Sequence, residues 1–142
     1  MAYPTDPVPV LLIPADLKLP MVYQKAYLFF GAGNLDCPDL ATSIKADWIE
    51  VVRPAGLKDA RYGSVQIVMI VDEEGVLRDK PMNARASWLY QTHFHGHPIR
   101  GDALLVGEGP TDDSGEMDLV PLPAPFTQEK WSDLWPPQML EP

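Results

Sequence analysis

Cysteine is almost absent from this sequence, and long apolar runs and an excess of basic residues are missing. Cys37 is the single cysteine in 142 residues, so no internal disulfide can form, and a reducing compartment suits the chain. No apolar run approaches the roughly 20 residues that a membrane-spanning helix needs. Residues 1–6 lack the pattern of a secretory signal. We therefore expect a cytoplasmic protein that does not enter a membrane.

Positive charge is scarce, because 11 Lys and Arg residues stand against 20 Asp and Glu residues and give a net charge of −9. An acidic chain repels nucleic-acid phosphates, so we expect no direct binding to DNA or RNA. Hydrophobic residues make up 46% of the sequence, which is ordinary for a globular protein and sufficient for a core at this length.

Proline is abundant, with 16 residues that gather mainly toward the two ends of the chain. The length and the absence of an internal repeat or an inter-domain linker indicate one domain. We expect a single α+β domain over residues 1–125, followed by an amphipathic helix and tail over residues 126–142.

Apolar segments predict a small, mainly antiparallel sheet of about four to six strands. The clearest strand is 65–71, whose unbroken apolar stretch from Ile67 to Val71 indicates a central strand covered on both faces. Further strands are expected at 10–13, 21–30, 48–52 and 103–106, with 117–122 pairing back onto the last of these.

The residues after the clearest strand predict a hairpin. Residues 72–75 read as a turn in which Gly75 takes a positive φ. Val76 and Leu77 would then begin the return strand.

Two short helices are expected within the domain, over residues 38–46 and 83–91. Pro38 suits the first helical position of one, and Asn83 suits the N-cap of the other. In the second helix, Ala86, Leu89 and Tyr90 form an apolar stripe that should face the core.

The C-terminal segment predicts a short helix with a one-sided aromatic stripe. Thr127 is a suitable cap, and Phe126 and Trp131 fit the positions of a hydrophobic staple. The stripe consists of Trp131, Leu134 and Trp135. It either docks on its own domain or anchors a partner, since tryptophans dominate interface hot spots.

The three histidines are the sharpest chemical feature of the sequence. His93, His95 and His97 alternate, so in an extended segment their side chains would point the same way and could bind one zinc ion. Successive side chains on one face are about 6.5 Å apart, so the segment would have to bend. The alternative is a polar loop between a helix and a strand.

A second candidate site, for an anionic ligand, consists of Asn83, Arg85 and Arg100. Exposed N–H groups at a helix N-terminus attract anions, and arginine adds paired hydrogen bonds. The alternative is that Asn83 only caps the helix and that Arg85 is solvated or paired with Glu73 or Glu74.

Several short blocks occur in an order and spacing that resemble a known family. They are Trp48-Ile49-Glu50-Val51-Val52, Ile70-Val71-Asp72-Glu73-Glu74-Gly75, Pro81-x-Asn83-x-x-Ala86-x-x-Leu89-Tyr90 and Gly96-His97-Pro98-Ile99-x-Gly101-x-Ala103-Leu104-Leu105-Val106-Gly107. Over roughly residues 46–122 the chain resembles the family called domain of unknown function three-eight-four-six. The resemblance implies a small accessory protein of phages, plasmids or bacterial genomes, notably actinobacterial ones, and assigns no catalytic residue.

These observations favour a non-enzymatic binding protein of a phage or mobile element that acts on a protein partner or self-associates in the host cytoplasm. No cofactor is expected, with zinc as the exception if the histidines bind a metal. One alternative is a protein that binds a small molecule or a metal ion at a site around His93, His95 and His97. Such a site could also catalyse a hydrolysis. Another is an acidic inhibitor of a nucleic-acid enzyme.

Overall fold

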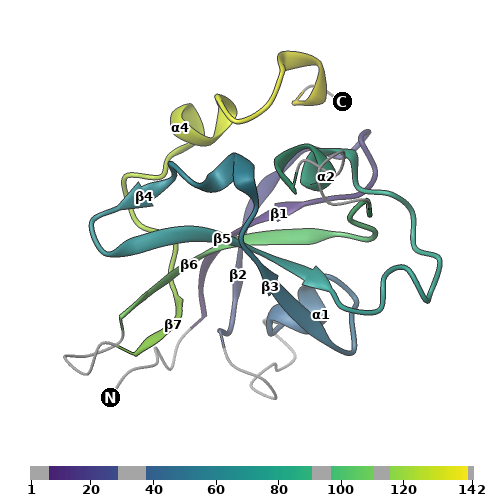
Figure 1. The fold of residues 1–142 in the computed structure, drawn as a ribbon, viewed down its shortest axis with the longest axis horizontal. Helices are drawn as coiled ribbons and strands as arrows, with labels where there is room; N and C mark the ends of the chain where they lie inside the picture. Colours follow the sequence, from purple (N-terminus) through teal and green to yellow (C-terminus); the bar gives the residue numbers. More distant parts are fainter. Residues whose placement is uncertain (1–6, 29–37, 91–96, 111–115, 141–142) are drawn as a thin grey trace.

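A seven-stranded sheet, antiparallel at every pairing, forms the centre of the molecule (Figure 1). The computed structural model describes residues 7–28, 38–90, 97–110 and 116–140. The strands are β1 (Val8–Ile13), β2 (Val22–Ala26), β3 (Ile49–Val52), β4 (Arg61–Tyr62), β5 (Val65–Asp72), β6 (Ala103–Pro110) and β7 (Met117–Val120). Their order is β2-β1-β6-β5-β3, with β4 also on β5 and β7 also on β6. The α+β class with a mainly antiparallel sheet is confirmed, with more strands than expected because short β4 also pairs with β5.

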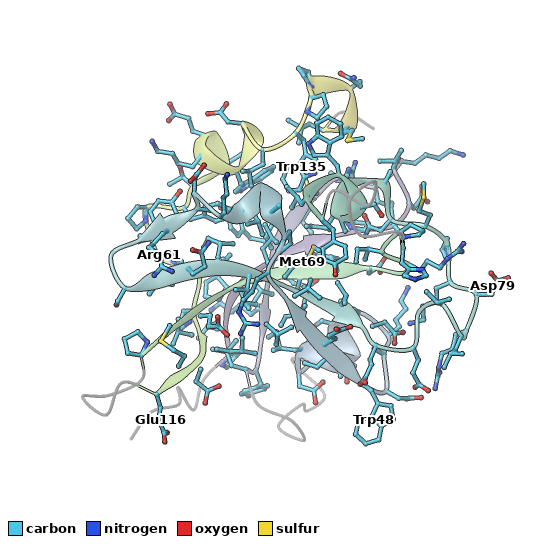
Figure 2. The ribbon with its side chains drawn as sticks, viewed as in Figure 1. Trp48, Arg61, Met69, Asp79, Glu116 and Trp135 are labelled. Carbon is cyan, nitrogen blue, oxygen red and sulfur yellow. The ribbon has the colours of Figure 1, made fainter. Side chains whose placement is uncertain are left out.

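Strand β5 is an interior strand whose two faces are both buried. Ile67, Met69 and Val71 enter one apolar cluster, while Val68 and Ile70 enter the other. This alternation follows from the pleat, which turns successive side chains to opposite faces. Met69 lies at the centre of the molecule in Figure 2. The prediction of a strand covered on both faces is confirmed.

Helices cover both faces of the sheet (Figure 1). One face carries α2 (Ala84–Tyr90), α4 (Gln128–Ser132) and the 3₁₀ turns η1 (Ala55–Leu57) and η2 (Pro137–Met139), and the other carries α1 (Leu40–Ser43). No helix in these described ranges is long and apolar enough to cross a membrane.

Helix α1 is shorter than predicted and begins later. The N-cap is Asp39, whose Oδ1 accepts a hydrogen bond of 2.9 Å from the Thr42 backbone N–H. Pro38 therefore precedes the cap and is not the first helical residue. Leu40 and Ile44 bury against the sheet, so one helical turn is enough to cover this part of it.

The predicted return strand at Val76 and Leu77 is wrong. Residues 73–79 form consecutive turns, and both edges of β5 are already paired, with β3 and β6. No edge remained for another strand. The residue with positive φ is Asp79, at 51°, and not Gly75. Gly75 is required for a different reason, because a Cβ there would lie 2.7 Å from the Arg100 carbonyl oxygen.

The strand predicted at residues 103–106 is present but longer than expected. Strand β6 continues past Val106 and Gly107 to Pro110, and β7 pairs back onto it as expected. Gly107 sits inside the strand because a Cβ there would lie 2.6 Å from the Pro121 carbonyl oxygen.

The C-terminal segment docks on its own domain, the first of the two alternatives for its aromatic stripe (Figures 1 and 2). Trp131 and Trp135 are 5% and 4% exposed and belong to the same apolar cluster as β5. Trp131 Nε1 donates to the Tyr23 hydroxyl at 2.9 Å, and Trp135 Nε1 donates to the Arg85 carbonyl at 2.8 Å. Leu134 packs partly buried against that cluster. The α4 helix begins after Thr127 as predicted, although the Thr127 side chain makes no capping hydrogen bond.

Candidate functional site

A pocket of about 270 Å³ lies at the C-terminal end of β5. Its walls are the edge strand β3, the turn after β5, the end of α2 and the segment 97–100. Val52, Val71 and Ile99 form its buried apolar part, and Glu50, Glu73 and His97 are exposed at the surface. The lining residues are Glu50, Val52, Val71, Asp72, Glu73, Gly75, Val76, Tyr90, His97, Pro98, Ile99 and Arg100. We call it the acidic pocket.

The start of α2 holds the segment that carries His97 and Arg100. The Asn83 backbone N–H donates to the Ile99 carbonyl at 2.8 Å, and the Ile99 N–H donates to the Ser87 hydroxyl at 2.9 Å. A bridge between Met82 and Arg100 continues this pairing. One wall of the acidic pocket is thus fixed to the helix by several hydrogen bonds.

A buried ion pair holds the opposite wall. The Asp72 carboxylate is fully buried; its Oδ1 accepts from the Glu74 N–H at 2.8 Å, and its Oδ2 pairs with Lys80 Nζ. The Lys80 carbonyl in turn accepts from Arg100 Nη1 at 3.0 Å. Because these contacts join residues 72, 80 and 100, the turn closes against the segment that carries His97.

The acidic pocket keeps two carboxylates without a cation. Glu50 and Glu73 line it, are exposed, and make no ion pair with any residue that the structure describes. Arg100 lines the pocket as well, but its guanidinium lies 3.7 Å from the Asp79 carboxylate. The pocket therefore presents unneutralised negative charge over an apolar floor.

Three large apolar side chains are exposed near the turn after β5; Val76 lines the acidic pocket, Leu77 follows it in the turn, and Trp48 precedes β3. Trp48 is 64% exposed, Val76 60% and Leu77 84%, and we call them the apolar rim. The Glu73 N–H donates to the Trp48 carbonyl at 3.1 Å, which brings the start of β3 beside the turn. In Figure 2 the Trp48 side chain points away from the sheet into solvent.

An ion pair between Arg78 and Asp47 also links the turn after β5 to the residues before β3. Hydrogen bonding to Asp47, with the neighbouring charges of Asp47 and Glu74, raises the pKa of Arg78 above its ordinary value. Both residues are exposed, so the pair orients the turn and adds little stability.

Of the three histidines, only His97 lies within the described residues, and it lines the acidic pocket. His93 and His95 lie outside them. Among the residues that the structure places, no group of three His, Cys, Asp or Glu side chains is arranged to hold a metal ion. The zinc site stays a prediction.

Asn83, Arg85 and Arg100 do not gather around one pocket, and only Arg100 lines the acidic one. Asn83 is fully buried, and its Oδ1 accepts from the Ala86 N–H at 2.9 Å, which confirms the N-cap. Its Nδ2 donates to the Ile13 and Gly101 carbonyls at 2.8 and 3.0 Å. Its polar atoms therefore already have protein partners.

Arg85 is neither solvated nor paired with Glu73 or Glu74, so that interpretation is wrong. It is fully buried, and its Nε, Nη1 and Nη2 donate to the carbonyls of Met139, Leu19 and Leu17 at 2.6, 2.7 and 3.2 Å. Burial lowers the pKa of Arg85, and the nearby charge of Asp16 partly offsets this. An anion at this position would have to displace backbone acceptors.

The sequence interpretation missed Glu50, Glu73 and the apolar rim. The sequence interpretation placed Trp48 in a strand with Glu50, whereas Trp48 lies in the bend before β3. The position of β3 at the edge of the sheet is a property of the strand order.

Comparison with known proteins gives a family and a fold. No curated protein matches the chain. Among solved structures, a crystal structure of the small RNA methyltransferase HEN1 matches with a TM-score of 0.54 and 20% identity. The match covers 87% of this chain and 16% of that one, and at this identity it shows the fold alone. The model of the family "Domain of unknown function (DUF3846)" matches residues 39–128, which include the whole acidic pocket. The chain therefore belongs to the DUF3846 family, as the sequence resemblance indicated.

Proposed function

We propose that this protein is a non-enzymatic binding protein whose acidic pocket and apolar rim receive a basic segment of a protein partner. The observation that carries the proposal is a pocket whose Glu50 and Glu73 make no ion pair within the described residues and whose lining includes the exposed Val76. Exposed aromatic and aliphatic side chains grouped around a cavity are typical of interaction sites.

The pocket matches the chemistry of a lysine or arginine side chain. Such a side chain has an apolar stem and a charged head. Val52, Val71 and Ile99 offer an apolar floor for the stem, and Glu50 and Glu73 offer acceptors for the head. The volume of about 270 Å³ suits one side chain better than a larger ligand, whose pockets usually span roughly 300–1,000 Å³.

The net charge of −9 extends this complementarity beyond the pocket, because it attracts a basic partner from a distance. The setting implied by the sequence resemblance, an accessory protein of a phage or mobile element in the host cytoplasm, is part of the proposal.

The test is affinity capture from a bacterial lysate with matched variants. Leu77→Asp and the double variant Glu50→Gln, Glu73→Gln alter the proposed surface. Leu19→Asp is the control, because Leu19 is 52% exposed on a different segment. We expect one protein to be retained by the parent chain and by Leu19→Asp, and to be lost from the other two. Equal retention by all four chains would remove the proposal, and circular dichroism verifies that each is folded.

A second candidate function is binding of a small molecule or of zinc in the same pocket. His97, Glu50, Tyr90 and Arg100 line it together, which places groups of both charges around one volume. Native mass spectrometry of untagged protein, with elemental analysis, measures any bound species directly. A bound metal or small molecule that disappears in His97→Ala supports this function, whereas a bare chain mass contradicts it.

A further inference from the structure

A second pocket, of about 340 Å³, lies at the other end of β5 and differs in charge from the first. Its lining residues are Arg53, Pro54, Ala55, Lys58, Arg61, Gln66, Ile67, Glu108 and Met117. We call it the basic groove. It gathers three of the 11 Lys and Arg residues of a chain whose net charge is −9.

The cations of the basic groove are only partly neutralised. Glu108 pairs with Arg53, and the bond from Arg53 Nε to Glu108 Oε1 is 2.9 Å. Lys58 and Arg61 are exposed and make no ion pair with any side chain in the described ranges. Among the lining residues alone, three cations and one carboxylate give a surplus of two positive charges; Asp59, exposed between Lys58 and Arg61 in sequence, does not line the groove.

The floor of the groove fixes the backbone that carries these two cations. Gln66, on β5, donates from Nε2 to the Leu57 carbonyl at 2.6 Å and to the Ala60 carbonyl at 3.1 Å. Lys58 lies between these two acceptors in sequence, and Arg61 follows them as the first residue of β4 (Figure 2). These hydrogen bonds tie the backbone on either side of Lys58, and just before Arg61, to β5.

We propose that the basic groove binds the phosphate group of a small phosphomonoester. A phosphate monoester carries about −1.5 to −2 charges at neutral pH, which matches the surplus of two. Arginine donates paired hydrogen bonds to phosphate oxygens, and lysine adds a mobile charge. Pro54, Ile67 and Met117 supply apolar walls for the organic part of the ligand.

A polyanion is a poorer ligand for this groove than a single phosphate group. A nucleic acid would bring many phosphates close to a molecule of net charge −9, and most of them would meet repulsion. The groove and the acidic pocket lie at opposite ends of β5, so this proposal does not depend on the proposed function.

Phenyl phosphate is a suitable probe because it joins a phosphate to a small apolar body. We expect saturable binding by isothermal titration calorimetry at physiological salt, with shifts in backbone amide NMR signals centred on residues 58–61. The double variant Lys58→Gln, Arg61→Gln should weaken this binding by about tenfold or more. The matched control is Lys18→Gln, Lys130→Gln, which removes the same charge from exposed lysines elsewhere and should change the affinity by less than about twofold.

Three outcomes would overturn the proposal. They are the absence of phenyl phosphate binding to the parent chain, equal loss in both double variants, and amide shifts located away from residues 58–61. A short oligothymidylate is titrated in parallel, and if it binds tighter than phenyl phosphate, the groove is a nucleic-acid site and the proposal is wrong. Thermal melting verifies that both double variants are folded.

Discussion

Arg85 has a positive charge in a fully buried position, where its hydrogen-bond partners within the described residues are three backbone carbonyls. A buried charge is costly unless polar groups replace the lost water. The carbonyl dipoles of Met139, Leu19 and Leu17 do so and fix two distant segments beside α2. The side chain therefore acts as a structural link.

Replacing Arg85 with methionine should destabilise the protein strongly. The change keeps an apolar stem but leaves three carbonyls without their donor, so the free energy of unfolding should fall by about 2–5 kcal/mol. Urea denaturation followed by tryptophan fluorescence measures it. Arg78→Met is the control, because Arg78 forms a solvent-exposed pair and its loss should leave the free energy of unfolding nearly unchanged. A similar loss in both variants would contradict the structural role.

Local residue patterns could be predicted from the sequence, whereas contacts between distant residues could not. Asn83 caps α2 by accepting a hydrogen bond from the backbone N–H of Ala86, three residues later, so its role follows from a short sequence motif. Arg85 donates hydrogen bonds to Leu19 and Met139, which are 66 and 54 positions away in the sequence. No local sequence motif predicts a contact over such a separation. For the same reason the sequence could not show that Glu50, Glu73 and His97 line one pocket.

At the scale of elements, β5 and the C-terminal segment show how neighbouring elements decide where a strand or helix lies. The apolar run of β5 indicated its two-sided burial because each face needs apolar cover. Val76 and Leu77 have the composition of a strand, but composition does not show whether an edge of β5 is free. The aromatic stripe of α4 was open to two interpretations, and its hydrogen bonds to Tyr23 and Arg85 distinguish them.

The docked C-terminal segment should contribute strongly to stability. Trp131→Ala should lower the free energy of unfolding by about 3–5 kcal/mol, because it leaves a cavity in the core and removes the hydrogen bond to Tyr23. Trp48→Ala should change it by no more than about 0.5 kcal/mol, because Trp48 is 64% exposed. Chemical denaturation of both variants measures the difference. Equal effects would show that α4 does not stay docked in solution.

At the scale of the whole molecule, strands from opposite parts of the sequence meet at the centre of the sheet. Strand β1 pairs with β6, and Leu11 lies opposite Leu105. Such long-range pairing slows folding, because the intervening chain must be ordered before the contact forms. The same order encloses β5 and β6 between other strands and leaves β2 and β3 at the edges.

Native-state hydrogen exchange should reflect this enclosure. We expect the amides of β5 and β6 to exchange most slowly, through global unfolding, because their strands are paired on both sides over most of their length. The amides of β4, which has two residues, should exchange faster through local opening. Exchange monitored by NMR over a denaturant series separates the two classes. Equal protection of β4 and β5 would contradict the expectation.

The contacts of Arg85 also bear on how the chain matures during translation. Its guanidinium reaches Leu19 and Met139, so its final acceptor is added 54 residues after the arginine itself. Until that residue has left the ribosome, the arginine lacks one of its acceptors, and the cluster around Trp131 and Trp135 lacks part of its cover. A nascent or prematurely ended chain would then expose an apolar surface and an unmet charge, the features by which chaperones and proteases distinguish unfinished proteins from finished ones.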